Sequence, residues 1–196
     1  MKKYFIPIAL ILISFALLVW QRFDLGPRTD VVVLASTSPH YLVGTHLRRG
    51  ETIETRANEY VAIGLGEARV GLSERTSLEL FRLYDDTRIL KFPRGRIIVH
   101  NPTNQSIYID TLKTQNNVTD ATATFINFDF LQTVHIIPLY HSVETVLVDT
   151  KDSLILPIAI AVQETVPVSY EPISFERFNN TAVDFYTWFD KLFVSQ

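Results

Sequence analysis

Apolar residues recur at every second position between Gly50 and His100, with small or polar residues between them. The alternating positions are Val61, Ile63 and Leu65, then Val70 and Leu72, Leu78 and Leu80, Leu90 and Phe92, and Ile97 and Val99. A period of two places these side chains on one face of a β-strand. Glycines at Gly64, Gly66 and Gly95 interrupt the runs where the chain is expected to reverse. The pattern predicts a mainly β fold of stacked short antiparallel strands, either a β-sandwich, a barrel or a β-solenoid.

Composition narrows the class of protein further. Hydrophobic residues make up 47% of the 196 residues, which is too apolar for a disordered chain. The net charge of -3 gives no electrostatic support for a nucleic-acid partner. Mixed charges on the strands indicate solvated outer faces or, as an alternative, an arginine-bearing face for an anionic partner. The absence of cysteine excludes a disulfide framework, a thiolate metal site and a cysteine nucleophile.

The segment 1–22 predicts a membrane anchor. Met1-Lys2-Lys3 precedes the run YFIPIALILISFALLVW, which carries no charge from Tyr4 to Trp20 and is about long enough to span a bilayer. Tyr4 and Trp20 lie at its two ends, where interfacial aromatic residues belong. Because no small residues follow the run at a cleavage site, we expect an uncleaved single-pass anchor rather than a secretory signal.

The positive-inside rule gives this anchor an orientation. The lysines before the run place the N-terminus in the cytoplasm, so the rest of the chain is expected outside the cytoplasmic (inner) membrane, in a periplasmic or extracellular location. Residues 23–45 are expected to form a spacer and a first strand, and residues 46–172 a β domain. Within that domain the polar stretch Lys113–Asp120 is interpreted as a loop, and Pro138 is expected at an edge or a bulge.

Residues 173–196 predict a C-terminal amphipathic helix, because apolar residues recur there at intervals of three and four. Either this helix packs over the β core, or its aromatic face docks on a partner or lies along the membrane surface. In the second case Phe185, Trp188 and Phe189 are the candidate partner-binding residues.

The sequence contains few candidates for catalytic or metal-binding residues. The pairs His135 and His141, and His40 and His46, lack the spacing of a metal site and are interpreted as structural or surface residues. Asp149 and Asp152 flank an expected turn, where solvated carboxylates are more common than an acid–base pair. No catalytic, cofactor-binding or metal-binding residue is therefore predicted, and we expect a non-enzymatic protein without a cofactor.

The region from Gly50 to Thr111 resembles a FecR-type domain. The matching units are Gly50–Thr55, VAIGL, Gly66 with EARVGL, Thr76–Leu80, and Leu90–Gly95 followed by RIIV and IYIDT, over about a third of the chain. The resemblance implies stacked short β-strands outside the cytoplasmic membrane. Two features depart from the family: TDATATFINF lacks the glycine of a Val-x-Gly-Thr-x-Phe unit, and only Met1–Lys3 precede the apolar run, where signalling members have a region that controls a sigma factor.

Three functions follow as hypotheses. The main one is a membrane-anchored, FecR-like binding or scaffold module of the cell envelope, with an envelope protein or cell-wall polymer as partner and no nucleic acid. The alternative is a transmembrane sensor or regulator that works with a separate cytoplasmic partner of the sigma-factor type. A third, disfavoured, is an envelope enzyme acting on polysaccharide, which would need a carboxylate pair such as Asp149 and Asp152.

Overall fold

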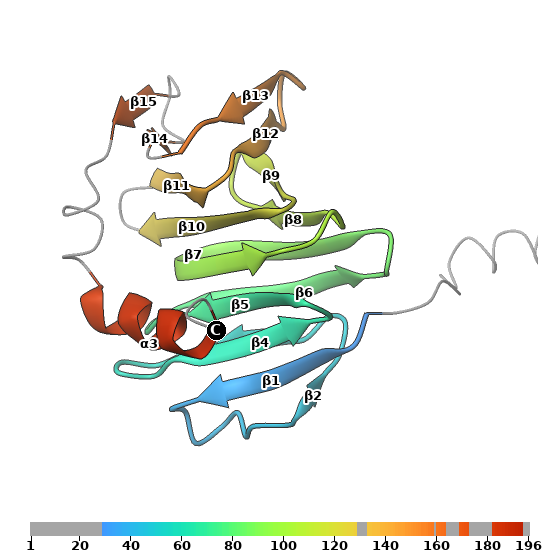
Figure 1. The fold of residues 1–196 in the computed structure, drawn as a ribbon, viewed down its shortest axis with the longest axis vertical. Helices are drawn as coiled ribbons and strands as arrows, with labels where there is room; N and C mark the ends of the chain where they lie inside the picture. Colours follow the sequence, from blue (N-terminus) through green and yellow to red (C-terminus); the bar gives the residue numbers. More distant parts are fainter. Residues whose placement is uncertain (1–28, 129–132, 159, 164–168, 173–181, 194–196) are drawn as a thin grey trace, which may run out of the picture.

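The computed structural model describes residues 29–128, 133–158, 160–163, 169–172 and 182–193. Their strands form one continuous sheet that folds into two facing layers, and this confirms the predicted mainly β fold (Figure 1). Neighbouring strands are antiparallel except for one parallel pair, β7 and β8.

We call the layer that carries the C-terminal helix the helix-side layer and the other the far layer. The helix-side layer contains, in spatial order, β2 (His46–Leu47), β1 (Val31–Ser36), β4 (Val61–Leu65), β5 (Ala68–Leu72), the second half of β7 (Arg88–Asn101), β10 (Ala121–Phe128), β11 (Thr133–Tyr140), β14 (Ile160–Gln163) and β15 (Ser169–Pro172). The far layer contains β3 (Thr52–Glu54), β6 (Ser77–Leu83), the first half of β7, β8 (Ile107–Asp110), β9 (Thr114–Val118), β12 (Val143–Leu147) and β13 (Ser153–Leu156).

Strand β7 joins the two layers. Up to Arg94 it pairs with β6 and β8 in the far layer, and from Gly95 it pairs with β5 and β10 in the helix-side layer. Gly95 has a φ of +98°, which is costly for any residue with a side chain. The sequence pattern predicted two strands interrupted at this glycine, whereas the chain stays extended and crosses from one layer to the other.

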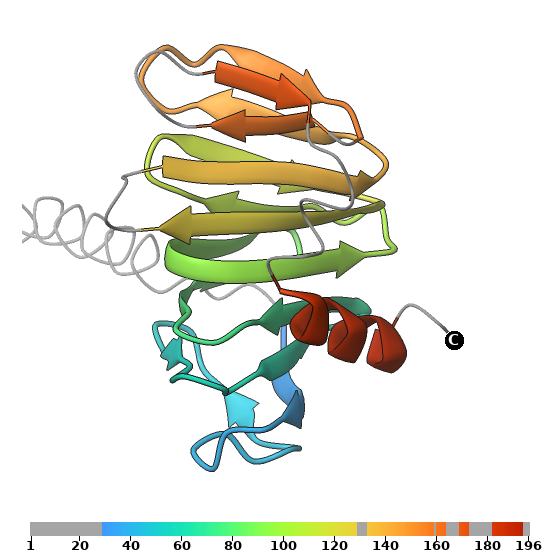
Figure 2. The ribbon, with the colours of Figure 1, turned by 90° about the vertical axis from the view of Figure 1, so that its left-hand side faces the viewer.

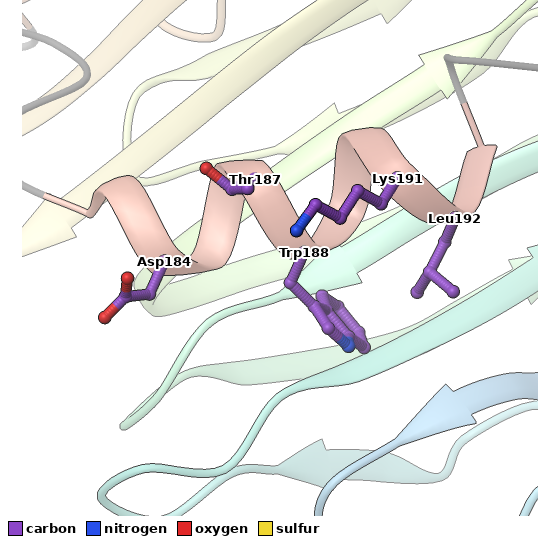
Figure 3. A pocket seen from close by; sticks show the side chains of 5 residues that line it. All are labelled: Asp184, Thr187, Trp188, Lys191 and Leu192. Atoms are coloured by element: carbon purple, nitrogen blue, oxygen red, sulfur yellow. The ribbon is translucent and has the colours of Figure 1, made fainter.

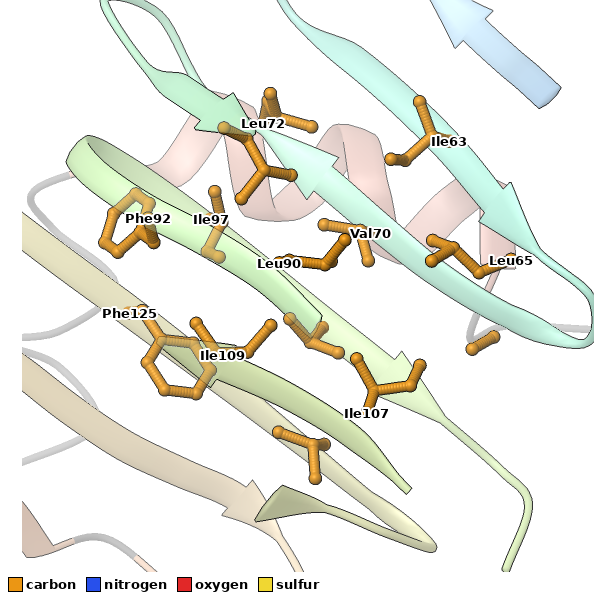
Figure 4. Close-up of a cluster of buried hydrophobic side chains, with 14 of the residues drawn as sticks. Ile63, Leu65, Val70, Leu72, Leu90, Phe92, Ile97, Ile107, Ile109 and Phe125 are labelled. Atoms are coloured by element: carbon orange, nitrogen blue, oxygen red, sulfur yellow. The ribbon is translucent and has the colours of Figure 1, made fainter. Parts of the chain in front are cut away.

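The core fills the space between the layers and follows the period-two pattern (Figure 4). Ile63, Val70, Leu90 and Phe125 are among its members, and each is at most 1% exposed. Residues from both layers meet there, so burial of apolar surface stabilises the stack as one unit. Strand β1, in the segment predicted as a spacer and first strand, pairs with β4 and contributes Val31 and Val33 to the same core.

One predicted loop is wrong and one predicted bulge is confirmed. Within the polar stretch Lys113–Asp120 the chain forms strand β9, and Asn116 is buried in the interior. Its amide donates to the carbonyl oxygen of Ile109 at 3.0 Å and accepts a hydrogen bond from Thr145 at 2.8 Å, so burial leaves no unpaired polar group. Pro138 lies at a shift of register between β10 and β11, as expected for a residue that cannot donate to the ladder.

The predicted anchor, residues 1–22 with Tyr4 and Trp20, lies outside the described residues. Within the described part of the chain, no helix is long and apolar enough to cross a membrane. The anchor therefore stays a prediction.

The crossing at Gly95 gives the first testable prediction. A Cβ atom added to Gly95 would lie 2.5 Å from the Cα atom of Thr76 at a backbone angle that already disfavours side chains. We expect Gly95→Ala to lower the free energy of unfolding by about 2–4 kcal/mol, through backbone strain and overpacking. Equilibrium urea unfolding of the full chain in mild detergent measures this change.

Gly44→Ala is the matched control, because Gly44 has a similar φ of +84° and no atom within 4 Å of the added Cβ. Its free energy of unfolding should fall only by the cost of a side chain at this positive backbone angle, about 1 kcal/mol. Equal losses for the two variants would contradict a close packing contact at the crossing.

Candidate interaction site on helix α3

Helix α3 (Val183–Phe193) lies against the outer surface of the helix-side layer (Figure 2). It is shorter than the predicted segment 173–196, of which residues 173–181 and 194–196 lie outside the described residues. Asp184 in its first turn and Lys191 in its last turn have the signs that the helix dipole favours at each end.

Two phenylalanines fix the helix to the sheet. Phe185 and Phe189 are one helical turn apart, so they point to the same side, and both are buried. Phe189 packs directly over Gly71 of β5, where an added Cβ would lie 2.5 Å from the phenyl ring and 2.9 Å from Ile98. Gly71 therefore leaves the space in the sheet surface that the aromatic ring fills. Ile126 and Ile137 belong to the same cluster.

Tyr186 adds a polar contact to this interface. Its hydroxyl group lies 2.9 Å from that of Thr124 on β10, and its ring lies 5.7 Å from the guanidinium carbon of Arg96. Burial raises the pKa of Tyr186 above its ordinary value, although the nearby Arg96 opposes this shift. The neutral phenol is therefore the form that fits between the helix and the sheet.

The structure places the three candidate partner-binding residues in two different environments. Phe185 and Phe189 form the contact between helix and sheet, as expected if the helix packs over the β core. Trp188 is half-buried and lies at the side of that contact, with its ring centroid 5.6 Å from that of Tyr60. Binding of a partner by these residues stays a prediction, and Trp188 is the one whose side chain still reaches solvent.

A pocket of about 390 Å³ opens along this side of α3, lined by Asp184, Thr187, Trp188, Lys191 and Leu192 (Figure 3). Trp188 and Leu192 supply apolar surface, while Asp184 and Lys191 place opposite charges along the same helix. Such a mixture suits an apolar side chain with polar groups around it, as a peptide segment presents. The charges were visible in the sequence, but the pocket depends on how the helix is turned on the sheet.

The other candidate residues do not come together. His46 Nδ1 lies 2.9 Å from a carboxylate oxygen of Asp30, and His141 Nδ1 lies 3.4 Å from one of Asp120. Both pairs are exposed on the surface. Asp149 and Asp152 are exposed at the turn between β12 and β13. Across the ranges that the structure describes, no three histidine or acidic side chains gather as a metal site would require.

Comparisons with known proteins bear on the fold. The sequence matches no known family profile and no curated protein. Two crystal structures of a proposed anti-sigma factor from Parabacteroides distasonis, at 1.65 and 2.50 Å resolution, are similar to this chain with a TM-score of 0.57 each. Their sequence identities are 11% and 10%, and the match covers 66% of this chain and 63% and 62% of those chains. The likeness therefore shows a shared fold over part of each protein.

The close fit at Gly71 can be tested directly. We expect Gly71→Ala to push Phe189 off the sheet and to raise the hydrogen-exchange rate of the α3 amides about tenfold, as overpacking by 1–3 kcal/mol would. Mass spectrometry of the full chain measures exchange peptide by peptide. In the control Gly64→Ala, the three atoms nearest to the added Cβ all belong to the side chain of Leu34, so α3 should exchange as in the wild type. Equal exchange in both variants would contradict the packing of Phe189 on Gly71.

The raised pKa of Tyr186 predicts a pH dependence. Above about pH 10 the unfolded chain loses the phenolic proton while the folded chain keeps it, so the free energy of unfolding falls as pH rises through this range. Tyr186→Phe should make the decline between pH 10 and 12 shallower. Thermal melts of the wild type and the variant over this range measure the difference, and Tyr108→Phe, on the far layer, serves as the control. Parallel declines in the wild type and Tyr186→Phe would contradict this assignment.

Proposed function

We propose that this chain is a signalling regulator of the anti-sigma type, whose β domain receives a signal outside the cytoplasmic membrane. In this proposal residues 1–22 anchor the protein in the membrane and connect the domain to a separate cytoplasmic partner of the sigma-factor type. The proposal assigns the chain no catalytic step and no cofactor.

The observation that carries the proposal is the two-layer β-fold, which the chain shares with a proposed anti-sigma factor. The resemblance to FecR-type domains supports the part of the proposal that concerns the β domain, because its motif residues lie at turns with positive φ and at hydrogen bonds between strands. Gly50 and Gly66 have φ values of +85° and +65° at turns. Thr55 and Thr76 connect neighbouring strands: Thr76 N–H donates to Thr55 Oγ1 at 2.9 Å, and Thr76 Oγ1 donates to the carbonyl oxygen of Arg96 at 3.1 Å. We propose that these units form a FecR-type domain.

Helix α3 is the surface that we propose receives the signal-giving partner. Its inner side packs against the sheet through Phe185 and Phe189, while the pocket at Trp188 and Leu192 stays accessible. Because both charged residues of the pocket are exposed, a partner segment with an apolar anchor and flanking polar groups would fit there.

A second candidate function is the envelope scaffold, which the outer surface of the far layer favours. A row of side chains crosses five strands there by direct pairing, from Ile89 through Tyr108, Asn117 and Glu144 to Ile155. Such a row of mixed apolar and polar groups suits the binding of a polymer or an envelope protein. The two functions predict different partners.

A complementation experiment tests the regulator. The gene is deleted in its source organism, and wild type, Trp188→Ala or Val183→Ala is restored. Under the proposal, deletion changes the transcripts of one promoter class and wild type restores them. Trp188→Ala should blunt the response at least about fivefold, as loss of a hot spot of 1 kcal/mol or more would. Val183→Ala should behave as wild type, because Val183 is exposed on the same helix but does not line the pocket.

Recovery of the intact, detergent-extracted protein from its membranes, followed by mass spectrometry, identifies the partners. A co-purified sigma-factor-type protein would support the regulator. Unchanged transcripts after deletion, together with recovery of only wall polymer or structural envelope proteins, would contradict it and favour the scaffold.

A further inference from the structure

Strand β13 ends the far layer at one end of the stack (Figure 1). It pairs with β12 on one side, and among the described residues it has no strand on the other side. An unpaired edge presents a row of N–H and C=O groups that can pair with another strand.

The other three edges carry features that discourage such pairing. Strand β2 has only two residues, β3 ends in the charged Glu54, and β15 contains Glu171 and Pro172. Strand β13 reads Ser-Leu-Ile-Leu, with no charge and no proline, and Ile155 is 72% exposed. It is the edge in the described part of the chain that is open to a further strand.

The hydrogen bonds beside β13 identify its free backbone groups. Leu147 N–H donates to the carbonyl oxygen of Asp152 at 2.9 Å, and Val148 N–H donates to that of Lys113 at 2.8 Å. In an antiparallel ladder hydrogen-bonded pairs alternate with non-bonded pairs. Leu154 therefore directs its backbone groups toward β12, whereas Ser153 and Ile155 direct theirs away from the sheet.

We propose that β13 pairs with β13 of a second copy of this chain, antiparallel and about a two-fold axis at Leu154. In this register Ser153 of each copy faces Ile155 of the other, so all four outward N–H groups and all four outward C=O groups are in bonding positions. The next register with the same backbone groups facing each other has its two-fold axis at Ile155 and would place Ser153 opposite Pro157, which has no N–H to donate. The far layer then continues from one copy into the next.

The charges around β13 fit a second copy as the occupant. Asp152 lies at one end of the strand, so in an antiparallel pair the two Asp152 side chains lie at opposite ends, each opposite a Leu156. The two Glu144 side chains are three strand spacings apart, about 15 Å, beyond the screening length at physiological salt. Since the edge itself is uncharged, nothing in it selects an oppositely charged peptide. Half-buried Leu154 would meet its copy at the open end of the core.

A single cysteine tests this register, because the chain has none of its own. In the proposed dimer the two Leu154 Cα atoms lie about 4.5 Å apart in a non-hydrogen-bonded pair, within the range of a disulfide. The two Ile155 Cα atoms lie about 9 Å apart, beyond it. Full-length Leu154→Cys and Ile155→Cys proteins in mild detergent are oxidised, and the covalent dimer is followed on non-reducing gels.

We expect Leu154→Cys to cross-link at least about tenfold faster than Ile155→Cys. Random collision predicts the reverse order, because Ile155 is 72% exposed and Leu154 is half-buried. Faster cross-linking of Ile155→Cys, or none in either variant, would overturn the proposal.

Sedimentation of the cysteine-free chain gives a measurement that does not depend on how these variants fold. The wild type should contain a dimer, and Ile155→Lys, which places a charge on the free edge, should be monomeric. A wild-type monomer at all concentrations would overturn the proposal. So would a dimer that Ile155→Lys leaves unchanged. Neither result bears on the transcriptional test of the regulator, so the two proposals can fail separately.

Discussion

The crossing of β7 between the layers at Gly95 is the constraint on which the rest of the structure depends. One strand supplies the centre of both layers, so β6 and β8 are built on its first half and β5 and β10 on its second half. Thr76 stabilises the crossing through two hydrogen bonds to Arg96: its hydroxyl group accepts from the N–H of Arg96 and donates to the carbonyl oxygen of the same residue. A side chain at Gly95 would collide with Thr76.

The helix-side layer uses the second half of β7 to support α3. Ile98 lies under Phe189, and Arg96 lies near the ring of Tyr186, so residues from the crossing strand reach the helix. The interface combines an aromatic ring seated on Gly71 with a pair of hydroxyl groups at Thr124. A helix of 11 residues is marginal in isolation, so these contacts rather than local propensity hold it in place. The accessible pocket follows from this orientation.

The two layers present different outer surfaces. The helix-side layer is covered in part by α3, beside which the pocket at Trp188 and Leu192 opens. The far layer carries a row of side chains across its strands and ends at the uncharged edge of β13. Because these surfaces lie on opposite faces and at an end of the stack, the proposed partner of α3 and the proposed second copy at β13 would not compete for the same residues. A regulator that receives one signal and also self-associates would use both.

Alternation alone determined a large part of this protein: the strands at Val61–Leu65, Ala68–Leu72 and Ser77–Leu83 and their inward-facing residues follow from a period of two. The spacing of aromatic residues likewise predicted a C-terminal helix. Strand β9 could not be predicted, because its interior position at Asn116 is polar and its partners, Ile109 and Thr145, are supplied by other strands. Only the tertiary structure decided that Phe185 and Phe189 face the sheet while Trp188 borders a pocket, since a helical period does not say which surface a helix will meet. The sequence could not identify β13 as a free edge either, because the order of the strands in the sheet decides which strand has a neighbour on one side only.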